Sequence, residues 1–196
     1  MVKKRNLVGA TVIAMQLTPL LLSAMKYFTC LLAGVLLLLC GNSHAQTTSR
    51  VFIVRHADRQ TEDDLNPAGI TRANELKRVL LQTGIDSIFS TNFVRTKKTV
   101  GPLAEALHLP VITYDSNPPL VQRLRAYNKG KTVLVAGHSN TVLPLVTALG
   151  CSAGNSTIPS GQFDDLFLVI LEYTKKGKRT TKACRLLHMK YGAATD

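Results

Sequence analysis

Short apolar runs and amphipathic segments alternate along the chain from residue 50 onward. The apolar runs are continuous and rich in β-branched residues, which is typical of strands buried on both faces; they cover residues 50–54, 85–90, 111–114 and 131–136. Between them, apolar residues recur at helical spacing over residues 67–83, 94–107, 119–128 and 141–149. Two last runs, 166–173 and 181–189, flank Lys175–Lys178 and predict a C-terminal hairpin.

Local signals set several helix ends. Asn66 followed by Pro67 is typical of a helix start, and Gly84 stops the same helix. Pro102 is expected to kink the helix over 94–107 or to delay its start. His108 is expected to cap the end of that helix.

The alternation of strands and helices predicts an α/β fold. We expect a three-layer α/β/α sandwich with a mostly parallel central sheet and a C-terminal hairpin. In such sheets, ligands bind beyond the carboxyl ends of the strands. The residues that follow each strand are therefore the first place to look for a site.

The first 45 residues have a different pattern. Two apolar blocks, Leu7–Ala24 and Tyr27–Leu39, are separated by Met25-Lys26, and small residues stand at Ser43 and Ala45. A positive start, an apolar stretch and small residues predict a secretory signal that is cleaved after Ala45. Residues 1–45 are then a signal region, with Met25 as a possible natural start, and residues 46–196 form the domain. A membrane anchor made of the first block or of both blocks is the alternative.

Charge and cysteines refine this picture. The chain has 24 Lys+Arg against 12 Asp+Glu, and residues 46–196 keep 20 of the basic residues and all 12 acids, a net charge of +8. Contact with nucleic acid or an anionic membrane is therefore permitted. Gly177 within Lys175–Lys178 favours a solvated turn, and an exported protein meets little nucleic acid, so we expect no nucleic-acid partner. We also expect no stable membrane insertion after signal cleavage. Export would also permit a structural disulfide between Cys151 and Cys184.

Three strand ends carry unusual residues, in the segments 55–59, 90–95 and 137–141. The sheet is expected to bring them to one rim, where they supply two imidazoles and up to three guanidiniums. Such a cluster repels itself unless an anion lies inside it. A tetrahedral phosphate fits, because its charge and geometry suit arginine.

This set of groups favours phosphoryl transfer. A neutral imidazole nitrogen can attack phosphorus and form a covalent intermediate that water hydrolyses. Arginines neutralise the non-bridging oxygens in the transition state, and a second imidazole hydrogen-bonds one of them. A carboxylic acid is needed to protonate the leaving oxygen.

The same segments resemble a known family. Arg55-His56-Ala57, Ser90-Thr91 with Arg95, and Gly137-His138-Ser139-Asn140-Thr141 are similar to motifs of the histidine phosphatase (phosphoglycerate mutase-like) superfamily, over about residues 50–173. The length matches its short single-domain members. The resemblance implies that His56 is the phosphorylated nucleophile and that Arg55, Arg95 and His138 complete a phosphate pocket.

Two features depart from the family pattern. Ala57 replaces the commoner glycine, which we expect to be tolerated unless the backbone there needs a positive φ. Ser139 follows His138, where the two-domain acid phosphatases have aspartate, and the insertions of those enzymes and of the mutases are missing.

The proton donor is left open by the sequence. Asp58, two residues from His56, is the first candidate, and Asp63 and Asp64 are alternatives. The alternative role for Asp58 is a salt bridge that orients Arg59 or Arg55. Arg59 is either a third phosphate ligand or a surface cation.

The sequence thus predicts an exported phosphatase, periplasmic or extracellular, that hydrolyses small phosphate monoesters through a phosphohistidine without metal or cofactor. Ser139 and Asn140 are expected to bind substrate. A phosphomutase and a non-catalytic phosphate- or phosphoglycan-binding module are the alternatives. A metal site built on His56 and His138 is disfavoured, because adjacent arginines repel a cation.

Overall fold

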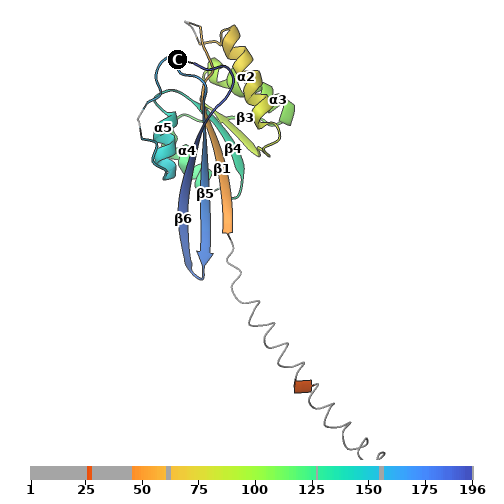
Figure 1. Ribbon diagram of the computed structural model, residues 1–196, viewed down its shortest axis with the longest axis vertical. Helices are drawn as coiled ribbons and strands as arrows, with labels where there is room; N and C mark the ends of the chain where they lie inside the picture. Colours follow the sequence, from red (N-terminus) through yellow and green to blue (C-terminus); the bar gives the residue numbers. More distant parts are fainter. Residues whose placement is uncertain (1–25, 28–45, 61–62, 127, 155–156, 196) are drawn as a thin grey trace, which may run out of the picture. The chain divides into compact units, whose positions relative to one another are not determined.

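A six-stranded sheet organises the chain from Gln46 onward (Figure 1). The structure is a computed structural model that describes residues 26–27, 46–60, 63–126, 128–154 and 157–195. The strand order is β3-β2-β4-β1-β5-β6. The strands are β1 (Gln46–Arg55), β2 (Ser87–Ser90), β3 (Val111–Thr113), β4 (Thr132–Gly137), β5 (Asp165–Lys176) and β6 (Arg179–Lys190).

The first four strands are parallel, whereas β5 runs antiparallel to β1 and β6 antiparallel to β5. Side chains alternate between the two faces. Val51 and Ile53 of β1 belong to one hydrophobic cluster, and Phe52 and Val54 belong to the other. Burial of both faces explains why the central strands read as unbroken apolar runs.

Two pairs of helices cover the two faces. Residues of α2 (Pro67–Leu80) and α3 (Val94–Leu107) pack in one cluster. Residues of α4 (Asn117–Ala126) and α5 (Val142–Leu149) pack in the other. The predicted three-layer sandwich, with its mostly parallel sheet and C-terminal hairpin, is confirmed.

The helix ends show which local signals decided them. The side chain of Asn66 accepts a hydrogen bond from the Gly69 amide at 2.8 Å, with Pro67 in the first turn, as the sequence predicted. α2 ends at Leu80, three residues before the expected end. α3 begins at Val94 and continues through Pro102, so the proline does not delay its start. His108 closes α3 in the left-handed conformation, with φ 53°, which confirms its predicted capping position.

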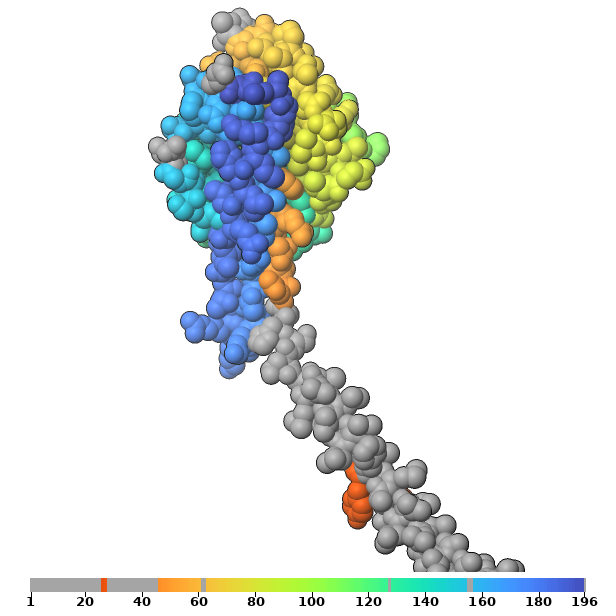
Figure 2. Space-filling model, in the orientation of Figure 1, coloured from red at the N-terminus to blue at the C-terminus, as the bar shows by residue number. Residues whose placement is uncertain are grey.

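The C-terminal hairpin is longer than the sequence indicated. β5 and β6 pair from Asp165↔Lys190 to Lys176↔Arg179, and the two residues Gly177 and Lys178 form the turn. Gly177 has φ 61°, a conformation that favours glycine. The end of the hairpin projects beyond the helices (Figure 1) and protrudes from the body of the domain in the space-filling view (Figure 2).

One disulfide bond cross-links the domain. Cys151, just after α5, is bonded to Cys184 of β6, with their Cα atoms 5.3 Å apart. The sequence permitted this disulfide but gave no distance to support it. The bond ties the loop that follows α5 to the edge strand.

Residues Ala45–Asp196 form one compact unit, which contains both hydrophobic clusters and the whole sheet. The predicted signal region, its alternative as an anchor and the proposed start at Met25 lie outside the described residues, apart from residues 26–27. Within the part of the chain that the structure describes, no helix is long and apolar enough to cross a membrane.

Candidate active site

The carboxyl ends of β1, β2 and β4 meet at one rim, as expected for neighbouring parallel strands. They surround a pocket of about 470 Å³. The pocket is lined by Arg55, His56, Arg59, Phe93, Arg95, His138, Ser139 and Asn140. Seven of these eight residues are ones that the sequence singled out. Asp58, the remaining predicted site residue, does not line it.

His56 lies at the base of the pocket and is 3% exposed. Its Nδ1 lies 2.9 Å from the carbonyl oxygen of Ala57, which can only accept, so Nδ1 carries the proton and Nε2 keeps its lone pair. The amide of Ala57 donates to Thr99 Oγ1 at 2.8 Å and fixes the loop to α3. Burial, assisted by the charges of Arg55 and Arg95, lowers the pKa of His56 to about 4. The imidazole is therefore neutral near pH 7, as a nucleophile must be.

Arg55 is anchored by the loop before β5. One terminal nitrogen donates to the carbonyl oxygens of Pro159, Ser160 and Gln162, each at 2.9 Å. The guanidinium lies 4.1 Å from the centre of the Phe163 ring. Its Nε is buried and has no hydrogen-bond acceptor among the described residues. Burial and the charge of Arg59 lower the pKa of Arg55, which shows that cations crowd this part of the pocket.

Arg95 approaches the same pocket from the first turn of α3. Its side chain pairs with Asp63 and lies 4.3 Å from the centre of the Phe93 ring. Its Nε is also buried without an acceptor in the described part of the chain. Arg55 and Arg95 thus both line the pocket, and each keeps a buried Nε–H group without an acceptor among the described residues.

His138 is held by a row of hydroxyls. Its Nε2 lies 3.0 Å from Thr91 Oγ1, which lies 2.9 Å from Thr96 Oγ1. The other ring nitrogen, Nδ1, lies 3.5 Å from a terminal nitrogen of Arg95. Because a guanidinium only donates, this contact places the ring proton on Nε2, directed at Thr91. Burial and Arg95 lower the pKa of His138, so this ring also favours the neutral form.

Gly137 allows the loop after β4 to come close to its neighbours. A Cβ atom there would lie 2.8 Å from Thr141 Oγ1 and 3.0 Å from Tyr114 Oη. Thr141 Oγ1 accepts the His138 amide at 2.9 Å. A larger residue would push the segment that carries His138 and Ser139 out of place.

The predicted alternative role of Asp58 was a salt bridge to Arg59 or Arg55. Asp58 does form a salt bridge, but its partner is Arg72. Asp58 Oδ2 lies 2.6 Å from Nε of Arg72, a residue of α2 that is 4% exposed. Arg72 also donates to the carbonyl oxygens of Tyr191 and Ala193. Asp58 therefore ties the loop after β1 to α2 and to the C-terminal segment.

The other two carboxylates lie elsewhere in the same loop. Asp63 accepts from the side chain of Arg95 and, at 3.0 Å, from the amide of Val94. Asp64 pairs with Lys98 at 2.7 Å. Of the three predicted candidates for the proton donor, Asp63 is the one that contacts a residue lining the pocket. Its burial acts to raise its pKa, but the hydrogen bonds from Val94 and Arg95 lower it overall.

Several residues at the site were not identified from the sequence. Phe93 and Phe163 form aromatic contacts to the two arginines, and Thr91 and Thr96 orient His138. Phe93, Thr91 and Thr96 lie within or beside the second motif, which is a signal that could have found them. Phe163 lies in a loop with no periodic pattern, so nothing local indicated it.

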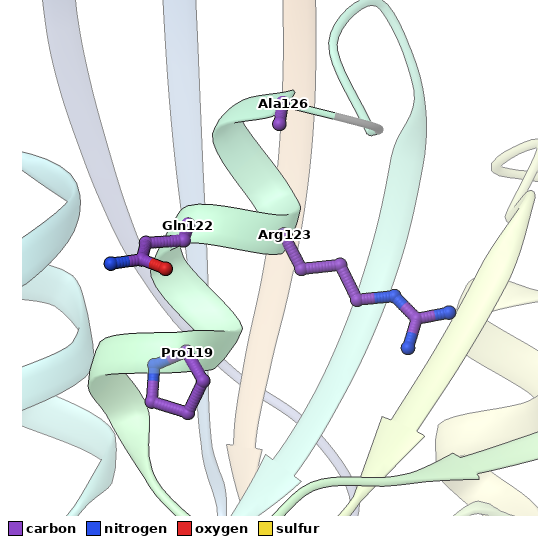
Figure 3. A pocket seen from close by; sticks show the side chains of 4 residues that line it. All are labelled: Pro119, Gln122, Arg123 and Ala126. Carbon is purple, nitrogen blue, oxygen red and sulfur yellow. The ribbon is translucent and has the colours of Figure 1, made fainter.

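A larger hollow, of about 640 Å³, lies beside α4 and is lined by Pro119, Gln122, Arg123 and Ala126 (Figure 3). Gln122 and Arg123 point in different directions along the helix surface (Figure 3). The four described residues that line the hollow include no imidazole, whereas two imidazoles line the smaller pocket. No group of three or more His, Cys, Asp or Glu suited to a metal ion occurs in the described ranges.

Comparisons with known proteins agree with this geometry. Residues 43–116 match the model of the Histidine phosphatase superfamily (branch 1). This segment contains His56 and Arg95, whereas His138 follows it. A search of curated proteins finds no match for the chain.

Solved structures share the fold. A mycobacterial protein described as hydrolase 2 has a TM-score of 0.53 at 14% identity, over 76% of this chain and 93% of its own. The native structure of a mycobacterial glucosyl-3-phosphoglycerate phosphatase has a TM-score of 0.51 at 16% identity, over 64% of this chain and 91% of its own. The match to this family model covers residues 43–116, which hold two of the three motifs, and the solved structures show that the fold is shared. The match to the family model supports phosphatase-type chemistry at the pocket.

Proposed function

We propose that this protein is an exported phosphatase that hydrolyses phosphate monoesters through a covalent phosphohistidine at His56. The observation that carries the proposal is the position of His56, buried and neutral, in one pocket with the two arginines Arg55 and Arg95. An unprotonated Nε2 has the lone pair that attack on phosphorus needs. The arginines then hold the non-bridging oxygens of the phosphoryl group.

The first step forms a bond between His56 Nε2 and phosphorus while the bond to the ester oxygen breaks. Arg55 and Arg95 neutralise charge on the phosphoryl oxygens as it builds up. The leaving alkoxide takes a proton from a carboxylic acid and departs as an alcohol. In the second step, water attacks phosphorus, the same carboxylate accepts its proton, and the phosphorus–nitrogen bond breaks to release phosphate.

We assign the proton-donating role to Asp63 in preference to Asp58. Asp63 contacts Arg95, whereas the carboxylate of Asp58 is held by Arg72 outside the pocket lining. In the free protein the hydrogen bonds to Asp63 lower its pKa, which opposes an acid role. A phosphoryl dianion on Arg95 would draw away that hydrogen bond and bring a like charge nearby. Both effects raise the pKa of a carboxyl group.

The chemistry is proposed to be independent of metal. The guanidiniums of Arg55 and Arg95 supply the positive charge that a metal ion supplies in other phosphatases, and they would repel a cation from the same pocket. Activity should therefore persist in EDTA. Metal bound in stoichiometric amounts and required for turnover would contradict this part of the proposal.

Small phosphorylated molecules are the proposed substrates, since the pocket is open and lined by short polar side chains such as Ser139 and Asn140. The fold relative named for glucosyl-3-phosphoglycerate suggests including a phosphorylated sugar acid among the compounds tested. A panel of phosphate monoesters, run with His56→Ala alongside, tests activity and ranks substrates together. Turnover that is lost in the variant supports the phosphatase, whereas phosphate binding without turnover supports a binding module. Transfer of phosphate between positions of one substrate supports a mutase.

Export to the periplasm or the extracellular space is part of the proposal. The pattern of residues 1–45 and the disulfide between Cys151 and Cys184 support it, because such bonds persist in oxidising compartments. N-terminal sequencing of the protein recovered from cells should give Gln46 as the first residue. A protein that keeps residues 1–45 and fractionates with membranes would favour the anchor.

A further inference from the structure

The tip of the β5–β6 hairpin, residues Lys175–Lys182, carries five cations and no acid: Lys175, Lys176, Lys178, Arg179 and Lys182. Lys182 donates to the carbonyl oxygen of Leu149. The other four side chains are exposed and form no ion pair with a described residue. We propose that this hairpin tip docks the protein on an anionic phospholipid surface.

The hairpin tip is not part of the hydrophobic core. β4 begins at Thr132, which pairs with Arg50 of β1, and Arg50 also pairs with Ile170 of β5. On the hairpin side of this row, only β1, β5 and β6 continue the sheet. From Ile170 to Lys176 the hairpin extends about 20 Å further, at roughly 3.3 Å per residue. Tyr173 is the last buried residue of β5, and every residue from Lys175 to Ala183 is exposed. Leu171 and Tyr173 still pack in a hydrophobic cluster, but the part of the hairpin beyond Tyr173 buries no apolar side chain and needs a reason other than stability of the fold.

The charges at the tip also oppose hairpin formation. Lys176 lies directly across from Arg179, and like charges in this position destabilise a strand pair. No acidic residue on the tip offsets this repulsion, since the nearest one on β5, Glu172, is opposite Ala183. An external anionic surface would remove the repulsion and gain attraction from all four exposed cations.

The place where the chain enters the domain favours a membrane over other polyanions. Gln46, the first residue of β1, pairs with Thr174 beside the hairpin tip. In the sequence, the apolar block Tyr27–Leu39 ends only a few residues before Gln46. The cations thus lie beside the point where the chain enters the domain, and an apolar block of the predicted signal region precedes that point in the sequence. They would hold the domain at a membrane surface whether that block stays attached or is removed.

This orientation leaves the candidate active site accessible. β1 runs ten residues from Gln46 to Arg55, about 30 Å at the usual rise per residue. The pocket opens at the far end of the strand, so docking of the hairpin tip does not cover it. The inference is independent of the proposed phosphatase activity.

Vesicle binding of the domain from Gln46 onward, which contains both hydrophobic clusters, tests the proposal. Vesicles of phosphatidylcholine with phosphatidylglycerol are compared with vesicles of phosphatidylcholine alone in a sedimentation assay. Lys176→Glu with Arg179→Glu reverses two charges at the tip. The matched control, Lys77→Glu with Arg123→Glu, makes the same change in net charge on α2 and α4. Thermal unfolding of each variant verifies that it is folded.

The proposal predicts binding to the anionic vesicles alone, weakened by added salt. The tip variant should lose about tenfold or more in partition coefficient, because each basic residue near such a surface contributes several-fold. The control should change by less than about twofold to threefold. Equal loss in both variants, no binding by the unaltered domain, or tighter binding to an RNA oligonucleotide than to the anionic vesicles would overturn it.

Discussion

The carboxylate of Asp63 forms an ion pair with the guanidinium of Arg95, and Arg95 also lines the candidate phosphate pocket. The same carboxylate accepts the amide of Val94 at the start of α3. Asp63 thus accepts hydrogen bonds from one residue that lines the pocket and from the backbone beside it. If Arg95 binds the phosphoryl group as we propose, that group shares the guanidinium with Asp63.

Asp63→Asn should separate binding from proton transfer. Loss of the negative charge leaves Arg95 free, so phosphate or vanadate should inhibit a few-fold more strongly. Turnover of an alkyl phosphate should fall by about 10²-fold or more, because the leaving alkoxide needs a proton. Turnover of p-nitrophenyl phosphate should fall far less, since its leaving group is stable as an anion. Asp64→Asn is the matched control, and an equal loss for both substrates would count against the assignment.

Asp58→Asn should act on stability rather than on proton transfer. Arg72 is 4% exposed and would lose its carboxylate partner. Breaking one side of a buried pair costs about 3 kcal/mol or more, which corresponds to a fall in Tm of roughly 6–12 °C. Thermal unfolding measures the effect. The ratio of alkyl to p-nitrophenyl phosphate turnover should remain unchanged, and a selective loss of the alkyl substrate would return the acid role to Asp58.

The buried imidazole of His56 predicts how stability depends on pH. Its pKa is about 4 in the folded protein, against 6.5 for the ordinary side chain. Between these values the unfolded chain binds more protons than the folded one, so acid favours unfolding. The free energy of unfolding should therefore rise with pH from about 4 to 6.5, and His56→Gln should flatten this part of the curve. Denaturant titrations at several pH values measure it, and an equal slope in the variant would contradict the assigned burial.

The disulfide should contribute substantially to stability. Cys151 and Cys184 are 33 residues apart in sequence, and closing a loop of this length stabilises a fold by about 3–4 kcal/mol in the chain-entropy model. Replacing both cysteines with serine should lower the free energy of unfolding by that amount and leave the pocket intact at low temperature. A change below about 1 kcal/mol would show that the loop after α5 is held mainly by its packing.

Much of the fold was predictable because the central strands are unbroken apolar runs, whereas the helices have apolar residues at helical spacing. The run at 131–136 is apolar at every position since β4 is covered on both faces, and Asn66-Pro67 marks a helix start through local chemistry alone. The lengths of β5 and β6 were underestimated, because the hairpin continues into a solvated extension with no apolar pattern.

The site residues that directly follow a strand were predictable from the sequence. Those whose position depends on contacts with residues far away in the sequence were not. His56, Arg95 and His138 follow three parallel strands, so topology alone brings them together. The partner of Asp58 was not predictable, since Arg72 reaches this loop residue from α2 while also contacting Tyr191. The anchoring of Arg55 by Pro159 and Gln162 joins residues more than a hundred positions apart.

The most direct test of the account is the detection of phosphohistidine at His56. The protein is mixed with a phosphate monoester that it hydrolyses, quenched in mid-turnover with base, and analysed by mass spectrometry of its peptides. The account predicts an acid-labile phosphoryl group on the peptide that contains His56, absent from His56→Ala and formed as fast as the steady state requires. Turnover without that adduct, or an adduct on His138 instead, would contradict it.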